Sequence, residues 1–206
     1  WHYTPNAKLI VILRQPADRA FSHYNMILRN GYEPINDFAK ALAAEPARIS
    51  QGWWPGFHYR WQGLYAQHLA RYLELFDKRQ LCVLLYEDLL ADPAGLMKRV
   101  YTFLGVDETF APDTARRYNE GGSRPVHGTL NAWLRNNRLT RALRRHAQPI
   151  YQPLKRAANA TLTQRPVLAP AFRDELTQSY REEIMRLQEL IARDLSQWLA
   201  PAARRG

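Results

Sequence analysis

The stretch that decides the fold is Lys8-Leu-Ile-Val-Ile-Leu-Arg14-Gln-Pro16-Ala-Asp-Arg-Ala-Phe-Ser22. Residues 8–13 form a short, continuous apolar run rich in β-branched side chains, which is typical of a strand buried on both faces. Pro16 suits the first position of a helix, and apolar residues then recur with helical spacing until Gly31 ends the pattern. The stretch therefore predicts a buried strand followed directly by a helix.

The rest of the chain repeats the alternation of apolar runs and helical patterns. A second buried strand is predicted at residues 81–86, LCVLLY. Helices are predicted at residues 34–44, 61–76, 92–105, 129–146 and, as one long helix, 172–198. Strands separated by helices indicate an α/β fold with a parallel sheet. Because two strands make a poor sheet, we expect either that its other strands are encoded before Trp1 or that the sequence pattern shows too few strands.

Length and composition fit one globular domain spanning residues 1–206. The chain is 46% hydrophobic and 23% charged, and no apolar run approaches the length of a membrane span. Cys82 is the only cysteine, which excludes an intrachain disulfide and favours a cytoplasmic protein. It lies in an apolar run, so we expect a buried, inert thiol. The six histidines show no metal-ligand spacing, and no metal is predicted.

The net charge of +10 is concentrated in one part of the chain. Residues 116–156 hold ten Lys or Arg residues and one acid, Glu120. Within this segment a basic stripe recurs at helical spacing, formed by Arg135, Arg138, Arg141 and Arg145 with Arg144 beside it. Such a stripe is either a solvated helix face or a surface for an anionic glycan, a membrane or a nucleic acid. No aromatic-interleaved nucleic-acid motif accompanies it.

Arg14 and Ser22 are the first candidates for a binding site. Ligands of parallel α/β sheets bind beyond the carboxyl ends of the strands, and Arg14 follows the first strand directly. Ser22 falls within the first two turns of the next helix. A guanidinium and a hydroxyl near a helix N-terminus can together hold a phosphate. Arginines at strand ends also occur without ligands, and Arg19 has an alternative role as a salt-bridge partner on the helix face.

The stretch KLIVILRQPADRAFSHY closely resembles the 3′-phosphate-binding segment of sulfotransferases that use 3′-phosphoadenosine 5′-phosphosulfate (PAPS). The family pattern is an apolar strand followed by Arg-x-Pro-x-x-Arg-x-x-Ser, which Arg14, Pro16, Arg19 and Ser22 match. The resemblance implies that Arg14 and Ser22 bind the 3′-phosphate of the donor. It also implies a P-loop-NTPase-like three-layer fold.

The resemblance continues along the chain in the family's order. Gly63-Leu-Tyr65, Tyr86-Glu-Asp-Leu-Leu-Ala-Asp-Pro93, Phe103-Leu-Gly-Val106 and Arg193-Asp-Leu-Ser-Gln-Trp198 resemble its later segments. A Gly-rich basic loop closes over the donor in the family, and Gly121-Gly-Ser-Arg124-Pro is its counterpart here. The resemblance implies donor contacts from Arg124 and from the amides of Gly122 and Ser123. The alternative for Arg124 is an ordinary loop charge.

Two parts of the family's site have no counterpart in the sequence. One is the N-terminal loop that neutralises the 5′-phosphosulfate, and the other is the upstream Glu or His that serves as catalytic base. Only 13 residues precede Arg14, so we expect a domain that lacks its N-terminal part and is inactive or very weak by itself. The catalytic residues are unassigned, and an exposed sheet edge is expected to promote association.

Two further groups of residues have a functional and a structural interpretation. The aromatic loop, residues 51–59 (QGWWPGFHY), is either a wall that stacks on an acceptor or a loop packed over the core. Glu87 and Asp88 follow the second strand and either reach a ligand or cap the next helix.

The sequence as a whole predicts a sulfotransferase that moves a sulfuryl group from PAPS to an acceptor hydroxyl or amine, with a small molecule or a glycan as acceptor. No metal, nucleic acid or transmembrane segment is expected. One alternative is a nucleotide kinase-like relative, which a Gly-x-x-x-x-Gly-Lys-Ser/Thr loop would favour. The other is a non-catalytic module that binds acidic polymers through the basic stripe.

Overall fold

The computed structural model describes residues 2–113, 124–125, 163–164 and 166–202. The chain divides into two compact units, the first formed by residues 1–20, 60–118 and 169–206 and the second by residues 21–59 and 119–168. The prediction of a single domain over residues 1–206 stays a prediction.

In chain order the helices and strands of the first unit are β1 (Leu9–Leu13), the start of α1 (Pro16–Arg29), η2 (Trp61–Gly63), α4 (Tyr65–Leu73), η3 (Lys78–Gln80), β2 (Leu81–Leu85), α5 (Tyr86–Ala91), α6 (Pro93–Leu104), α10 (Pro170–Ser179), α11 (Arg181–Ile191) and α12 (Ser196–Leu199).

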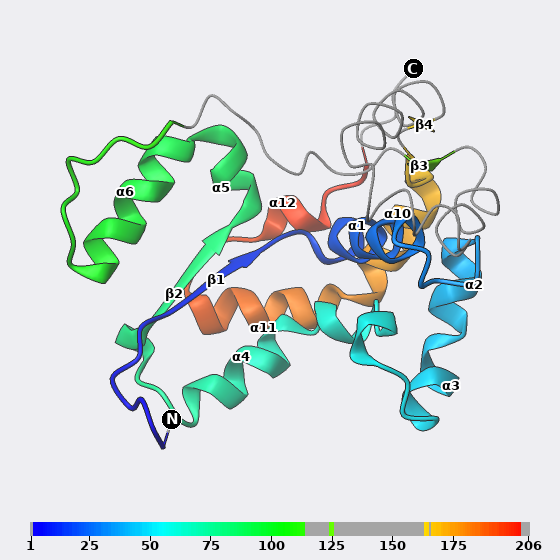
Figure 1. Ribbon diagram of the computed structural model, residues 1–206, viewed down its shortest axis with the longest axis horizontal. Helices are drawn as coiled ribbons and strands as arrows, with labels where there is room; N and C mark the ends of the chain where they lie inside the picture. Colours follow the sequence, from blue (N-terminus) through cyan, green and yellow to red (C-terminus); the bar gives the residue numbers. More distant parts are fainter. Residues whose placement is uncertain (1, 114–123, 126–162, 165, 203–206) are drawn as a thin grey trace, which may run out of the picture. The chain divides into compact units, whose positions relative to one another are not determined.

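The two predicted strands, β1 and β2, form a parallel sheet. Their register runs from Leu9 opposite Leu81 to Leu13 opposite Leu85, and Figure 1 shows the two strands side by side. The sheet confirms the parallel α/β prediction. The prediction that β1 is buried on both faces is wrong for the described residues, because Ile10 is 42% and Ile12 is 48% exposed. Successive side chains of a strand point to opposite faces, and these two share the exposed one.

Lys8 connects the start of β1 to the end of α6. Its ammonium group donates to the backbone oxygens of Phe103 and Leu104, both at 2.8 Å. The last carbonyl groups of a helix have no partner within the helix, and a cation there also stabilises the helix dipole. Gly105 ends α6 with a left-handed φ of 73°, as its place after the apolar pattern predicts.

Helices α4 and α11 pack against each other beside the sheet (Figure 1). Gly63 allows the chain to enter α4, since a Cβ at this position would lie 2.8 Å from the hydroxyl oxygen of Tyr180. Tyr180 is fully buried, and its hydroxyl donates to the backbone oxygen of Arg60 at 3.0 Å. Packing in this unit therefore joins residues from two chain segments that are more than 100 positions apart.

The single helix predicted for residues 172–198 is three helices, α10, α11 and α12. Tyr180 separates the first two with a non-helical ψ of 1°, and Ala192 ends α11 with a left-handed φ of 52°. Asp194 then accepts from the backbone N–H of Ser196, which begins α12. The apolar spacing continued across both breaks because Leu176, Ile184, Leu187, Leu195 and Trp198 are all buried in one core. Periodicity therefore identified the buried residues and missed the breaks.

The second unit contains the rest of α1, then α2 (Phe38–Ala43), α3 (Glu45–Ser50) and η1 (Pro55–Phe57). One helix was predicted at residues 34–44, whereas α2 begins after Asp37, whose side chain accepts from the N–H of Lys40 at 2.8 Å. Pro46 lies in the first turn of α3, where its missing N–H costs nothing. Two short antiparallel strands, β3 (Arg124–Pro125) and β4 (Thr163–Gln164), also belong to this unit.

Candidate functional site

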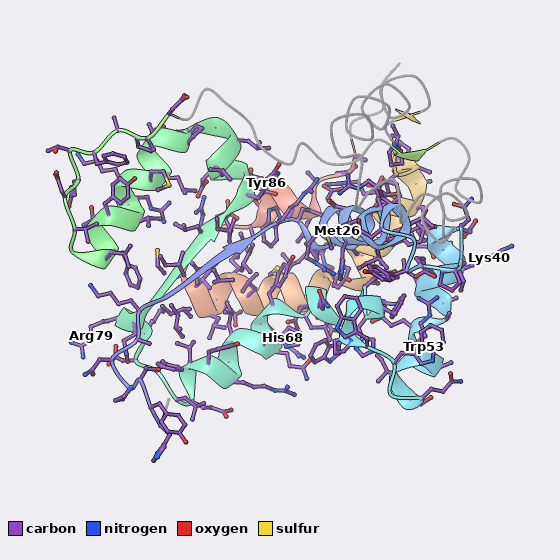
Figure 2. The ribbon with its side chains drawn as sticks, viewed as in Figure 1. Met26, Lys40, Trp53, His68, Arg79 and Tyr86 are labelled. Atoms are coloured by element: carbon purple, nitrogen blue, oxygen red, sulfur yellow. The ribbon has the colours of Figure 1, made fainter. Side chains whose placement is uncertain are left out.

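Arg14 lies at the carboxyl edge of the sheet, where its position after β1 places it. Its guanidinium carbon is 5.0 Å from the ring centroid of Tyr86, the residue that follows β2 and is labelled in Figure 2. The hydroxyl of Tyr65 donates to the backbone oxygen of Arg14 at 2.9 Å. Since Leu13 and Leu85 are paired in register, Arg14 and Tyr86 leave neighbouring strands at the same level. Both the backbone and the side chain of Arg14 are thus held.

Tyr65 remains a neutral hydrogen-bond donor beside Arg14. Burial raises its pKa to about 12, although the nearby guanidinium groups of Arg19 and Arg14 act in the opposite direction. A neutral hydroxyl fixes the backbone without neutralising the charge of Arg14. Neither Tyr65 nor Tyr86 was identified as part of the site from sequence, because their contacts with Arg14 join residues far apart in the chain and have no local pattern.

Gln15 organises the turn from β1 into α1 and was also missed. It is only 2% exposed, and its side-chain amide donates to the Thr177 hydroxyl at 2.7 Å and to the Trp198 carbonyl at 3.3 Å. Its side-chain oxygen accepts from the N–H of Asp18 at 2.8 Å, which caps α1. A polar residue between a strand end and Pro16 was the available signal. Gln15 therefore fixes the direction in which α1 leaves Arg14.

The first turn of α1 is tied down by its own charged residues. Asp18 receives two hydrogen bonds from the guanidinium of Arg173, at 2.9 and 3.1 Å. Arg19 donates to the side-chain oxygen of Gln62 at 3.3 Å. Gln62 is a neutral partner, so the alternative role of Arg19 as a salt-bridge partner on the helix face stays a prediction.

Ser22 lies within the first two turns of α1 and is partly exposed. Helix α1 runs without interruption from Pro16 to Arg29, so one continuous segment connects Arg14 to Ser22. The confirmed part of the prediction is this placement at a strand end and in the following helix. Phosphate binding by the two residues stays a prediction.

The remaining predicted donor residues lie outside what the structure describes. Gly122 and Ser123 precede the described residues 124–125, and the backbone of Arg124 begins β3 while its side chain is not described. The basic stripe, Arg135 to Arg145, also lies outside the described residues. Their predicted donor and anion contacts therefore stay predictions.

Glu87 and Asp88 hold the elements of the first unit together. They lie in the first turn of α5, a helix that begins directly after β2 and that the sequence pattern did not indicate. Glu87 accepts from the backbone N–H of Gln15 at 3.2 Å, and Asp88 forms two hydrogen bonds of 2.6 Å with the guanidinium of Arg193. These hydrogen bonds lower the pKa of Asp88. The helix starting at Pro93 is instead capped by Asp92, which accepts from the N–H of Gly95 at 2.8 Å.

The aromatic loop of residues 51–59 rests on a buried ion pair in the second unit. Arg48 donates to both carboxylate oxygens of Glu33, at 2.8 and 2.7 Å, and the Tyr59 hydroxyl donates to the same carboxylate at 2.5 Å. Burial raises the pKa of Glu33, but the hydrogen bonds from Arg48 and Tyr59 outweigh it and hold that pKa below its usual value. Burial and the same carboxylate raise the pKa of Tyr59.

The loop is part packed and part exposed; packing is observed for several of its residues, and its role as an acceptor wall stays a prediction. The guanidinium carbon of Arg48 lies 5.2 Å from the ring centroids of Trp53 and Phe57, and Tyr59 packs edge-on against His23 and Tyr24 of α1. Trp54 is 59% exposed, and a Cβ on Gly56 would overlap its ring. Glycine at position 56 thus lets the Trp54 ring lie against the loop backbone.

Comparison with known proteins decides the family. The model of the sulfotransferase domain matches residues 2–120, which include β1, Arg14, Ser22 and β2. The chain belongs to the sulfotransferase domain family. This sulfotransferase domain is also 31% identical over 165 residues to human heparan sulfate glucosamine 3-O-sulfotransferase 6, a match covering 74% of the chain and 46% of that relative.

Two further matches agree with this assignment. Human bifunctional heparan sulfate N-deacetylase/N-sulfotransferase 3 is 35% identical over 105 residues, which are 50% of the chain and 12% of that protein. The crystal structure of a sulfotransferase from Alicyclobacillus acidocaldarius superposes with a TM-score of 0.67 and 31% identity, covering 95% of the chain and 59% of that structure. The predicted fold class is confirmed. The chain spans less than half the length of these curated relatives.

Within residues 2–113, 124–125, 163–164 and 166–202, no group of three or more His, Cys, Asp and Glu residues is arranged to hold a metal ion. In the same part of the chain, no helix has the length and apolar character needed to cross a membrane. The metal-free donor chemistry expected for the family stays a prediction.

Proposed function

We propose that this chain forms the 3′-phosphate part of the donor site in a sulfotransferase that uses PAPS. In the reaction, an acceptor oxygen or nitrogen forms a bond to the sulfur of the donor. The bond between that sulfur and the 5′-phosphate oxygen breaks, 3′-phosphoadenosine 5′-phosphate leaves, and the acceptor loses its proton. By analogy with phosphoryl transfer, positioning and charge stabilisation supply most of the catalysis.

The observation that carries the proposal is the placement of Arg14 at the carboxyl edge of the sheet. Its described side-chain contact is the ring of Tyr86, and an aromatic ring orients a guanidinium without neutralising it. Anions bind where a strand end meets a helix N-terminus, because backbone N–H groups and the helix dipole favour negative charge. The segment also carries the family's Arg-x-Pro-x-x-Arg-x-x-Ser pattern.

Titration calorimetry with 3′-phosphoadenosine 5′-phosphate tests this proposal, with AMP as the ligand that lacks the 3′-phosphate. Hydrogen bonds to charged groups contribute about 1.5–3 kcal/mol, so Arg14→Ala is expected to weaken binding about 10- to 150-fold. Ser22→Ala removes a neutral donor and is expected to cost about fivefold. AMP binding should change little in either variant.

The matched control is Arg71→Ala, which removes the same charge from an exposed position on α4. Arg71→Ala should bind the nucleotide as the unmodified chain does. Equal affinity for AMP and 3′-phosphoadenosine 5′-phosphate in a folded chain would contradict the 3′-phosphate assignment. A steep salt dependence without nucleotide preference would favour the acidic-polymer alternative instead.

A glycan is the acceptor class that we propose, and the exposed Trp54 supports it. Two of the matched relatives carry heparan sulfate in their names, and a flat aromatic face packs against sugar rings. The Glu33–Arg48 pair and Tyr59 hold the aromatic loop, and Tyr59 in turn packs on α1 beside Ser22 in sequence. The aromatic loop that carries Trp54 is therefore anchored, through Tyr59, to the helix that carries Ser22.

Binding of a heparan sulfate oligosaccharide to the full chain tests the acceptor proposal. Trp54→Ala is expected to weaken binding about fivefold, since an aromatic contact contributes about 1 kcal/mol, whereas Trp54→Phe should retain most of the affinity. Neither variant should change binding of 3′-phosphoadenosine 5′-phosphate. Unchanged glycan affinity in Trp54→Ala would overturn the acceptor role of this residue and leave the donor site unaffected.

A further inference from the structure

A cavity of about 290 Å³ opens beside the sheet of the first unit, and none of the donor-site residues lines it. Aliphatic side chains of α4, β2 and α11 form its walls: Leu69, Leu73, Leu81, Val83, Leu190 and Ile191. The volume is near the lower end of the range for pockets that bind small molecules. The walls therefore suit a short apolar group.

Three cations also line this cavity. Lys78, Arg99 and Arg193 line it, and none of its lining residues is acidic. In the described residues, Asp88 pairs with Arg193 at 2.6 Å and with Arg99 at 3.4 Å, and the charge of Glu87 also acts on Arg193. Three cations against two carboxylates leave a local surplus of positive charge. Lys78 contributes to this surplus, because the neighbouring Asp77 pairs with Arg79.

The backbone at the cavity wall has an uncommon conformation. Ala192, which ends α11 and lines the cavity, has a φ of 52°, and no other non-glycine residue in the described part of the chain has a positive φ. Residues other than glycine adopt this region at a cost, and such residues concentrate where a ligand is held. The turn at Ala192 brings the next residue, Arg193, to the same cavity.

The cavity is separate from the predicted donor site. It adjoins Leu81 and Val83 in the first half of β2, whereas Arg14 and Tyr86 follow the last residues of the two strands. Val83, the lining residue of β2 nearest to that edge, lies about 7 Å from Leu85 along the strand, and none of the donor-site residues lines the cavity. A second ligand class is therefore compatible with donor binding.

We propose that this cavity binds a small amphipathic anion, a medium-chain carboxylate or alkyl sulfate, with its chain between α4 and α11 and its head group toward the cations. Apolar walls favour removal of the chain from water, and the guanidinium and ammonium groups favour the anionic head. The proposal does not depend on the donor assignment, because none of the lining residues belongs to that site.

Titration of the full chain with octanoate, and with octan-1-ol as the neutral ligand of the same chain length, tests the proposal. Octanoate is expected to bind at one site and about tenfold more tightly than octanol, because only octanoate carries the charged head. Arg99→Gln and Lys78→Gln should each reduce the octanoate affinity severalfold and leave the octanol affinity unchanged. Arg71→Gln, an exposed cation outside the cavity, should have no effect.

A substitution that fills the cavity distinguishes binding of octanoate inside it from attraction of octanoate to cations on the protein surface. Leu73 is half-buried at the cavity wall, so Leu73→Trp is expected to fill the cavity while the chain stays folded by circular dichroism. Octanoate binding should then be lost, and binding of 3′-phosphoadenosine 5′-phosphate should remain. Retained octanoate binding in Leu73→Trp, equal affinities for octanoate and octanol, or the same loss in Arg71→Gln would each overturn the proposal. So would competition between octanoate and the nucleotide.

Discussion

The ends of β1 and β2 lie at the same edge of one sheet, yet their charged side chains have different partners. After β1, Arg14 contacts the ring of Tyr86, and its backbone is held by the Tyr65 hydroxyl. After β2, Asp88 forms two 2.6 Å hydrogen bonds with Arg193, and Glu87 accepts from the N–H of Gln15. After β1, the ring of Tyr86 orients the charge of Arg14. After β2, the guanidinium of Arg193 neutralises the charge of Asp88.

This difference distinguishes Arg14, the proposed ligand contact, from Glu87 and Asp88, whose partners lie within the fold. Both strand ends carry charged residues, and position alone made both candidates for ligand contacts. The partner of each charge decides between the two roles. A carboxylate paired with a guanidinium contributes to stability, and a cation stacked on an aromatic ring remains available to an anion. Substitution of Asp88 should therefore reduce stability more than nucleotide binding, and substitution of Arg14 should reduce nucleotide binding more than stability.

The largest loss of stability is expected from substitution of Arg48, whose guanidinium is buried, unlike those of Arg14 and Arg193. Arg48 and Glu33 have side chains that are 4% and 0% exposed. Arg48→Ala leaves the carboxylate of Glu33 buried without its cation and is expected to lower the free energy of unfolding by about 3–5 kcal/mol. Arg79→Ala, in an exposed pair with Asp77, should leave the denaturant midpoint unchanged. If Arg48→Ala and Arg79→Ala lowered the free energy of unfolding by similar amounts, burial would not determine how much each ion pair contributes to stability.

The next largest loss is expected from Gln15→Ala at the β1 end. This change removes the cap of α1 and the partners of Thr177 and the Trp198 carbonyl, and it should cost about 2–3 kcal/mol in urea unfolding. Gln67→Ala, on the exposed face of α4, is the control and should cost less than about 0.5 kcal/mol. If Gln15→Ala were equally mild, the turn would not depend on this side chain.

Asp88→Asn should cost less than Gln15→Ala, because the pair with Arg193 is partly exposed to water. The side chains of Asp88 and Arg193 are 26% and 32% exposed, so screening reduces the expected loss to about 1 kcal/mol at neutral pH. Arg193→Gln should cost a similar amount, and the double variant should cost less than the sum of the two. Additive effects in this double-mutant cycle would mean that the two residues do not interact.

The same pair predicts how stability depends on pH. The hydrogen bonds from Arg193 lower the pKa of Asp88 in the folded protein, so the unfolded chain binds the proton more readily. The stabilisation is therefore complete above the unfolded pKa of about 4 and is lost as pH falls through the lower folded pKa. The difference in unfolding free energy between the unmodified chain and Asp88→Asn should shrink below about pH 4. A constant difference down to pH 2 would contradict the shift.

Local patterns were enough to predict β1, the start of α1 and the position of Arg14 between them. The apolar run of β1 and Pro16 at the start of α1 follow from neighbouring residues, and the parallel pairing with β2 follows from the alternation of strands and helices. The contacts of Gln15 with Thr177 and Trp198 join residues more than 160 positions apart. No local pattern encodes such contacts. Breaks such as Tyr180 were missed for the same reason, since tertiary packing sets them.

Among the substitutions at the two strand ends, Arg14→Ala should have the smallest effect on stability. The contact with the Tyr86 ring is partly exposed and contributes about 0.5–1 kcal/mol, while the hydrogen bond from Tyr65 reaches the backbone and survives the substitution. The urea midpoint should therefore move less than in Gln15→Ala or Asp88→Asn. Binding of 3′-phosphoadenosine 5′-phosphate should nevertheless fall more in Arg14→Ala than in Asp88→Asn. A large loss of stability without a loss of binding would instead place Arg14 among the residues that hold the fold together, as Asp88 does at the neighbouring strand end.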